Sequence, residues 1–143
     1  MLHYRYKNHT ADIEFNAYGK SINELFDSSA LALFNIVAYS SKLKKSKSEG
    51  KSMVLHVHAK NYEELLWRSL QLLLSTADAK RIFFYGSSTK VKKCKSGFSA
   101  TIKAYYKPGS YEYAKLEAKG ISKYMLYIKR AKGRFASNVV VDV

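Results

Sequence analysis

Two hydrophobic periodicities along the chain constrain its fold more than any other sequence feature. Around residues 22–38 and 62–77, apolar side chains recur with the spacing of one helix face. The other apolar segments alternate or form β-branched and aromatic runs bounded by turns, as strands do. The predicted order is strand, strand, helix, strand, helix and then several strands. This order predicts an α+β fold, with two helices packed on a largely antiparallel sheet or lying between two sheets.

Both predicted helices begin at a recognisable cap. Ser21 precedes Glu24 in a capping box, in which the Glu24 side chain is expected to reach back to the Ser21 amide. Asn61 can cap the second helix. The polar stretch 40–52 is predicted to be a loop, and turns are predicted at 95–97 and 131–133. The predicted strands are 3–8, 13–18, 53–59, 82–85, 90–95, 98–107, 120–129 and 134–141.

The length of 143 residues, of which 47% are hydrophobic, predicts one domain over residues 1–143 with its own core. Cys94 is the single cysteine, which excludes an intrachain disulfide framework and a multi-cysteine zinc site. It lies among lysines that could activate a thiol, but no catalytic partner can be assigned, and an inert strand position is the preferred interpretation. Without a signal segment or an apolar run of about 20 residues, we expect a cytoplasmic protein with no membrane association.

The net charge of +14 points to an anionic partner, with nucleic acid as the first expectation. The excess is concentrated in residues 80–134, which contain 15 basic and two acidic residues, whereas both chain ends are slightly acidic. Interleaved tyrosines and lysines there could bind RNA. Lysine at alternate strand positions is equally the ordinary solvent face of a sheet. The basic residues concerned are Lys90, Lys92, Lys93, Lys95, Lys129, Arg130, Lys132 and Arg134.

Motifs for nucleophilic catalysis and for phosphate-binding loops are absent from the sequence. His56 and His58 share one face of a predicted strand, where they could bind a transition metal or simply face solvent, and solvent is the preferred interpretation. The scarce acidic residues are more informative. Asp12 follows a turn beside a predicted strand, and Asp142 ends the terminal apolar strand next to the Val143 carboxylate. If these strands pair, hard oxygen ligands for Ca²⁺ or Mg²⁺ would converge, although Asp12 could instead stabilise its own turn.

Several segments, in order from residue 4 to the end, resemble the archease family. The string His-Thr-Ala-Asp-Ile after a short strand is quite specific, and the terminal hydrophobic strand closing in Asp plus an aliphatic residue is also similar. The matching segments are His9–Ile13, Ala17–Gly19, Glu24–Phe26, Ala30–Phe34, Glu63–Leu66 and Val139–Val143.

The resemblance implies an archease-like sandwich and a protein cofactor rather than an enzyme. Archeases assist the RtcB-type RNA ligase of tRNA splicing, promoting its guanylylation and multiple turnover. The resemblance also implies a divalent-metal site on Asp12, Asp142 and the Val143 main-chain oxygen, with Ca²⁺ expected first and Mg²⁺ or Mn²⁺ as alternatives. Lys119, in a segment similar to a family motif, becomes a candidate partner contact. An older proposal for the family, a chaperone-like role toward a tRNA methyltransferase, leaves a basic RNA-binding or chaperone protein in tRNA processing as the alternative function.

The chain also departs from the family pattern. Family members are usually acidic, whereas this chain is strongly basic. Arg68 occupies a position that is acidic in the family, and the stretch Tyr111–Ala114 lacks a usual histidine. These differences affect the expected partner surface and leave Asp12 and Asp142 unchanged.

Overall fold

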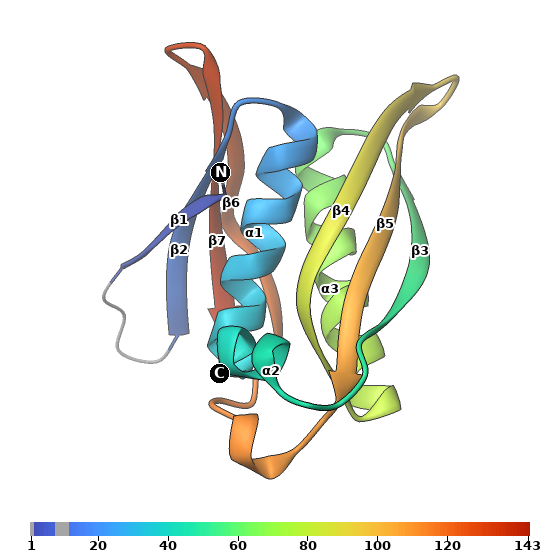
Figure 1. The fold of residues 1–143 in the computed structure, drawn as a ribbon. Helices are drawn as coiled ribbons and strands as arrows, with labels where there is room; N and C mark the ends of the chain where they lie inside the picture. The colour runs from blue at the N-terminus through green and yellow to red at the C-terminus, as the bar shows by residue number, and fades with distance from the viewer. Residues whose placement is uncertain (1, 8–11) are drawn as a thin grey trace.

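The structure is a computed structural model that describes residues 2–7 and 12–143. The described residues form seven strands, three α-helices and one 3₁₀ turn, in the order that Figure 1 shows. The strands are β1 (His3–Lys7), β2 (Asp12–Gly19), β3 (Lys51–Ala59), β4 (Ile82–Cys94), β5 (Gly97–Pro108), β6 (Gly120–Ala131) and β7 (Arg134–Asp142). The helices are α1 (Ile22–Val37), α2 (Ser40–Lys45) and α3 (Tyr62–Lys80), and the 3₁₀ turn is η1 (Tyr111–Tyr113).

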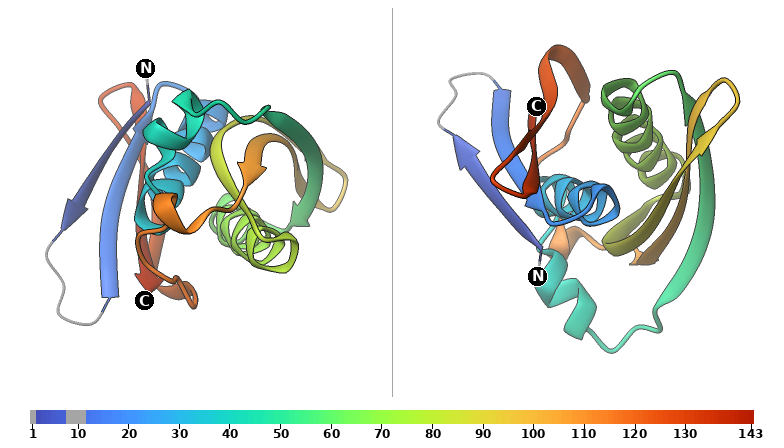
Figure 2. Two further views of the ribbon diagram at one scale, coloured as in Figure 1. Left: turned by 60° about the horizontal axis from the view of Figure 1, so that its bottom comes forward. Right: turned by 90° about the horizontal axis from the view of Figure 1, so that it is seen from above.

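The strands form two antiparallel sheets, with the long helices between them (Figure 2). One sheet has the order β1-β2-β7-β6 and the other the order β3-β5-β4. Helix α1 packs on β2 and β4, so it contacts both sheets, while α3 packs on β6 and β3. The α+β prediction is therefore confirmed, and the version with helices between two sheets describes the molecule.

The core lies where the two sheets face α1 and α3. It is built largely from the apolar stripes that the periodicity identified, with the inward side chains of the strands packed against the buried faces of the helices. Phe15 and Val139 belong to the first sheet, Leu33 and Leu70 to the helices, and Ile102 to the second sheet; each is at most 1% exposed.

The helix starts form as the caps predict. The Ser21 hydroxyl accepts a hydrogen bond of 3.1 Å from the Glu24 amide, and Asn61 Oδ1 accepts one of 2.8 Å from the Glu64 amide. The Glu24 carboxylate accepts from the Lys20 amide at 3.2 Å, one residue before the expected Ser21 donor. The bonds to the Glu24 and Glu64 amides satisfy donors that the first helical turn leaves without a backbone acceptor.

Both predicted hairpin turns are present. Lys95 and Ser96 connect β4 to β5, and Lys132 and Gly133 connect β6 to β7. Lys132 and Gly133 have φ angles of 54° and 74°, the left-handed pair that a two-residue hairpin of the primed type requires.

The predicted loop 40–52 was wrong in part, because α2 occupies its first half. Leu43 is the one apolar residue of this helix and is 1% exposed. A single apolar residue within a run of Ser and Lys produces no periodic signal, so the hydrophobic pattern could not reveal the helix.

The predicted strands 82–85 and 90–95 are one continuous strand, β4, with a register shift between Phe84 and Gly86. The intervening polar residues looked like a break. Instead, the hydroxyls of Ser87 and Thr89 donate to Asp27 Oδ1 on α1 at 3.0 and 2.7 Å. Thus a buried side of the strand carries polar residues because a helix carboxylate accepts their hydrogen bonds.

No helix of the described residues is both long and apolar enough to cross a membrane.

Leu33→Ala tests the position of α1 between the sheets. Removing this buried side chain should lower the free energy of unfolding by about 2–5 kcal/mol, since a cavity would remain between two rigid layers. Leu116→Ala, at a side chain that is 48% exposed, is the control and should change it by less than about 0.5 kcal/mol. Urea unfolding monitored by circular dichroism measures both, and equal effects would contradict the packing described.

Asp27→Asn tests the link between α1 and β4. Burial raises the pKa of Asp27 above its ordinary value, more strongly than the Thr89 and Ser87 hydrogen bonds lower it. A raised pKa in the folded state means that protonation favours folding, so this group stabilises most below the ordinary aspartate pKa and loses that contribution as pH rises. Relative to Asp27→Asn, the parent should therefore gain stability as pH falls from 7 toward 4 in urea titrations. If the stability difference between the parent and Asp27→Asn stayed constant or shrank as pH fell, the raised pKa of Asp27 would be contradicted.

Candidate functional site

Asp12 and Asp142 lie directly opposite each other on neighbouring strands. Asp12 begins β2, Asp142 ends β7, and the antiparallel register pairs the two residues. Side chains at paired positions point to the same face with Cβ atoms about 4.5–5.5 Å apart. The strand pairing on which the predicted convergence depends is therefore present. Residues 9–11 of the matching motif lie outside the described residues.

Lys119 and Gly120 flank Asp142 on its other side. Gly120 pairs with Asp142 in the β6–β7 ladder, and the Lys119 amide donates to the Asp142 carbonyl at 2.7 Å. The Lys119 side chain is exposed. The predicted partner-contact residue thus adjoins the acidic pair, and the backbone of Asp142 is held from both neighbouring strands.

Apolar packing fixes the end of β7 below the carboxylates. Val139 and Val141 are fully buried in the core. Ile121 lies on the adjacent strand, β6, and both of its backbone polar groups are bonded to α3. Its carbonyl accepts from Trp67 Nε1 at 2.7 Å, and its amide donates to Gln71 Oε1 at 3.0 Å. Helix α3 therefore positions the start of β6, which in turn positions Asp142. The acidic pair thus lies within paired strands, at the start of β2 and the end of β7.

The chemistry of these groups fits a divalent cation. Two carboxylates directly opposite each other repel when both are ionised, and a hard cation would remove that repulsion. Within residues 2–7 and 12–143, no three His, Cys, Asp or Glu side chains gather at one place. A cation at Asp12 and Asp142 would consequently need main-chain oxygens, such as that of Val143, or water to complete its coordination.

An open groove of about 720 Å³ ends close to this edge. It lies between the C-terminal ends of α1 and α3 and the segment after η1. Glu117 and Ala118, just before Lys119, form part of its wall. The sequence does not reveal this groove, because its apolar residues come from α1, α3, β4 and the segment after η1; they include Val37, Leu74, Ala77, Ile82, Leu116 and Ala118.

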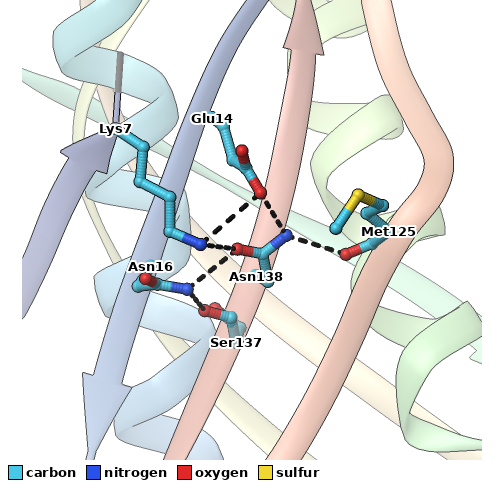
Figure 3. Close-up of polar contacts among 6 residues, drawn as sticks. All are labelled: Lys7, Glu14, Asn16, Met125, Ser137 and Asn138. Atoms are coloured by element: carbon cyan, nitrogen blue, oxygen red, sulfur yellow. Dashed lines mark hydrogen bonds and ion pairs between the residues drawn. The ribbon is translucent and has the colours of Figure 1, made fainter. Parts of the chain in front are cut away.

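A buried polar network on the outer side of the first sheet was also missed (Figure 3). Asn138 is fully buried, and its amide group donates to Glu14 Oε2 at 2.9 Å and to the Met125 carbonyl at 2.8 Å. Its Oδ1 accepts from Lys7 Nζ at 2.8 Å and from Asn16 at 2.9 Å. Met125 lies in the segment 123–126 that interrupts the β6–β7 register and has a φ of 59°. An asparagine directly before the apolar run Val139–Val141 was the signal that could have identified this network.

The other sequence candidates lie apart from the acidic pair. His56 and His58 are exposed on β3, on the solvent face as expected. Cys94 is exposed at the end of β4. Arg68 forms a 3.2 Å ion pair with Glu64 one helical turn earlier on α3, an exposed arrangement of small energetic value.

Comparison with known proteins places the whole described chain in one family. A model of the archease protein family matches residues 4–143. The chain belongs to the archease family. It is 29% identical over 147 residues to the protein archease of Pyrococcus abyssi, with 100% of both chains covered. It is 30% identical over 145 residues to that of Methanosarcina mazei, covering 98% of this chain and 95% of the relative.

Solved structures agree with the fold. The solution structure of protein 1598 from Methanobacterium thermoautotrophicum is similar with a TM-score of 0.84 and 24% identity, covering 98% of each chain. The crystal structure of an archease from Thermotoga maritima, described as a possible chaperone, is similar with a TM-score of 0.57 and 16% identity, covering 96% of this chain and 94% of that one. At these identities the structures establish the shared fold alone, which includes the sandwich expected from the resemblance.

Asn138→Ala tests the buried network. The substitution removes the donor to the Met125 carbonyl and to the buried Glu14 carboxylate. Losing one partner of a buried hydrogen bond costs about 1–3 kcal/mol. The free energy of unfolding should fall by at least that amount, and amide exchange of residues 123–126 should accelerate. Asn16→Ala, which removes a contact to Asn138 but none to Met125, should leave that exchange unchanged. Equal acceleration in both variants would show that Asn138 does not hold the segment.

Proposed function

We propose that this chain is a protein cofactor of an RtcB-type RNA-splicing ligase, promoting guanylylation of the ligase and its multiple turnover. Membership of the archease family supports a role of this kind, and the Thermotoga maritima relative is described as a possible chaperone, a protein that acts on another protein. In this proposal the chain is not itself an enzyme, and tRNA is reached through the ligase or through the basic surface.

The observation that carries the proposal is the cross-strand pairing of Asp12 with Asp142. We assign to Asp12, Asp142 and the Val143 main-chain oxygen the binding of a divalent cation, Ca²⁺ first and Mg²⁺ or Mn²⁺ as alternatives. Carboxylate and carbonyl oxygens are the donors that these hard cations prefer. A bound cation would supply positive charge at an otherwise acidic edge, available to phosphate or carboxylate groups of the ligase complex.

The surroundings of the pair suit contact with a partner. The Lys119 side chain is exposed beside Asp142, while its amide is bonded within the sheet. The backbone is thus fixed, and the ammonium group is free to sample a docking partner's carboxylates or phosphates. We therefore assign Lys119 to the contact with the ligase.

Asp12→Asn and Asp142→Asn separate the metal site from the fold. Without metal, each variant should be as stable as the parent or slightly more stable, because the substitution removes one of two facing like charges. With Ca²⁺ at about 100 times its Kd, the parent should gain about 2.7 kcal/mol of stability and the variants almost none. Titration calorimetry and urea unfolding, with and without Ca²⁺, Mg²⁺ or Mn²⁺, give both quantities. Glu112→Gln, at an exposed carboxylate of η1, is the charge-matched control. Equal metal affinity in all four proteins would refute the site.

Ligase activation is tested with the same variants. The parent and Glu112→Gln should increase the guanylylated fraction of an RtcB-type ligase and convert a single-turnover reaction into a multiple-turnover one. The two Asn variants should lose most of this stimulation, and Lys119→Ala should weaken it through a higher half-maximal protein concentration. Radiolabelled GMP transfer to the ligase measures the first step. The proposal would be rejected if the parent did not stimulate the ligase, or if Asp12→Asn stimulated it as strongly as the parent.

A further inference from the structure

The β3-β5-β4 sheet carries no acidic residue in any of its strands. Its inward positions, such as Ala100, Ile102 and Ala104, are buried against the helices. Figures 1 and 2 show α1 and α3 on one side of this sheet, and no helix of the described residues covers the other side. The three strands thus present a sheet surface without carboxylates, covered at one end where the buried Lys107 donates to the Lys44 and Ser46 carbonyls.

The strand register arranges the outward side chains in regular rows. One row joins His58, Ser99 and Lys92 across the three strands, and the next joins His56, Thr101 and Lys90. A third row joins Val54, Lys103 and Ser88. Rows two residues apart are separated by about 6.6–6.8 Å, and neighbouring strands by about 4.8 Å. We call these nine positions the basic rows.

Each of the basic rows offers one lysine and at least one hydroxyl to solvent. No ion pair joins Lys90, Lys92 or Lys103 to a carboxylate in residues 2–7 and 12–143. An ordinary solvent-facing sheet mixes both signs of charge, which limits its attraction to polyanions. Here the three ammonium groups act together, and the neighbouring Ser, Thr and His side chains supply further phosphate donors.

Two tyrosines continue this surface beyond the third row. The Tyr85 and Tyr105 rings lie 6.3 Å apart with a 36° tilt, and Lys103 Nζ lies 5.8 Å from the Tyr105 ring centroid. Both rings are partly exposed. Aromatic rings next to a row of cations form the usual platform for unpaired nucleic-acid bases.

The other basic hairpin, β6–β7, is less suited to that task. Three of its cations lie 4.4–5.4 Å from aromatic ring centroids, closer than the 5.7–5.8 Å of Lys107 from Tyr85 and of Lys103 from Tyr105. The three pairs of the hairpin are Lys129 with Tyr127, Arg130 with Phe135 and Arg134 with Tyr18. Within residues 2–7 and 12–143, Lys90 and Lys92 of the basic rows have no such ring contact.

We propose that the basic rows, extended by Tyr85 and Tyr105, bind single-stranded RNA. Protein interfaces centre on buried aromatic or aliphatic anchors, whereas Val54 is the one large aliphatic residue of these rows. A flat surface of repeated cations and hydroxyls bordered by tyrosine suits a sugar–phosphate chain better than an acidic protein. This RNA binding requires no ligase, so its test is independent of the proposed ligase activation.

The test measures binding of the full chain to a fluorescein-labelled single-stranded oligouridylate by anisotropy, from about 50 to 200 mM KCl. The triple variant Lys90→Gln, Lys92→Gln, Lys103→Gln should bind about tenfold more weakly or worse. Loss of three phosphate contacts should also make the slope of log K against log salt shallower by about 2. Tyr105→Ala should weaken binding without changing the slope, because stacking releases no counterion.

The matched control is Lys129→Gln, Arg130→Gln, Lys132→Gln, which removes the same charge from the β6–β7 hairpin. It should retain near-parental affinity. Equal losses in the two triple variants would overturn the proposal in favour of diffuse attraction by net charge, and so would undetectable binding by the parent. Competition by polyglutamate as effective as that by unlabelled RNA would overturn it in favour of an acidic protein partner. Circular dichroism confirms that each variant is folded.

Discussion

The fold depends on the pairing of β2 with β7, which joins two segments from opposite ends of the chain as the central strands of one sheet. β1 and β6 attach to this pair, and α1 packs on its inner face. Phe15 and Val139 are paired in register and fully buried, so the apolar contact across the pair anchors that side of the core. Closing a loop of more than a hundred residues has an entropic cost that local contacts do not repay. Burial of the apolar side chains of β2 and β7 must offset this entropic cost. The same strand pairing brings Asp12 opposite Asp142.

Much of this architecture could be predicted because the relevant signals are local. Ser21 and Asn61 marked helix starts, alternation marked strands, and Gly97 and Gly133 marked hairpin turns. Features that depend on distant partners could not be predicted. The six-residue helix α2 is stable only when Leu43 can be buried in the completed core. Ser87 and Thr89 fit within a strand only because Asp27 on α1 accepts their hydrogen bonds.

In the candidate site, too, the features with local signals could be predicted and those that depend on distant partners could not. Rarity drew attention to Asp12 and Asp142, and an apolar terminal strand next to Asp142 suggested a rigid setting. Their exact opposition depends on strand register, which no pattern within either segment specifies. Asn138 was overlooked because a buried amide is distinguishable from an exposed one only when its partners, Glu14 and Met125, are in place. The charge of +14 was visible at once, but the absence of acidic residues from the β3-β5-β4 sheet could be recognised only once the topology was known.

The interruption of β6 at residues 123–126 has a consequence for the behaviour of the molecule in concentrated solution. β6 is an edge strand of its sheet, and an unbroken edge offers amides and carbonyls to any incoming strand. In the middle of this edge, the left-handed backbone of Met125 and the carbonyl bonded to Asn138 remove the regular ladder. A second chain therefore finds only short stretches to pair with on either side. The polar network beneath the segment, by fixing its shape, also protects the sheet from edge-to-edge aggregation.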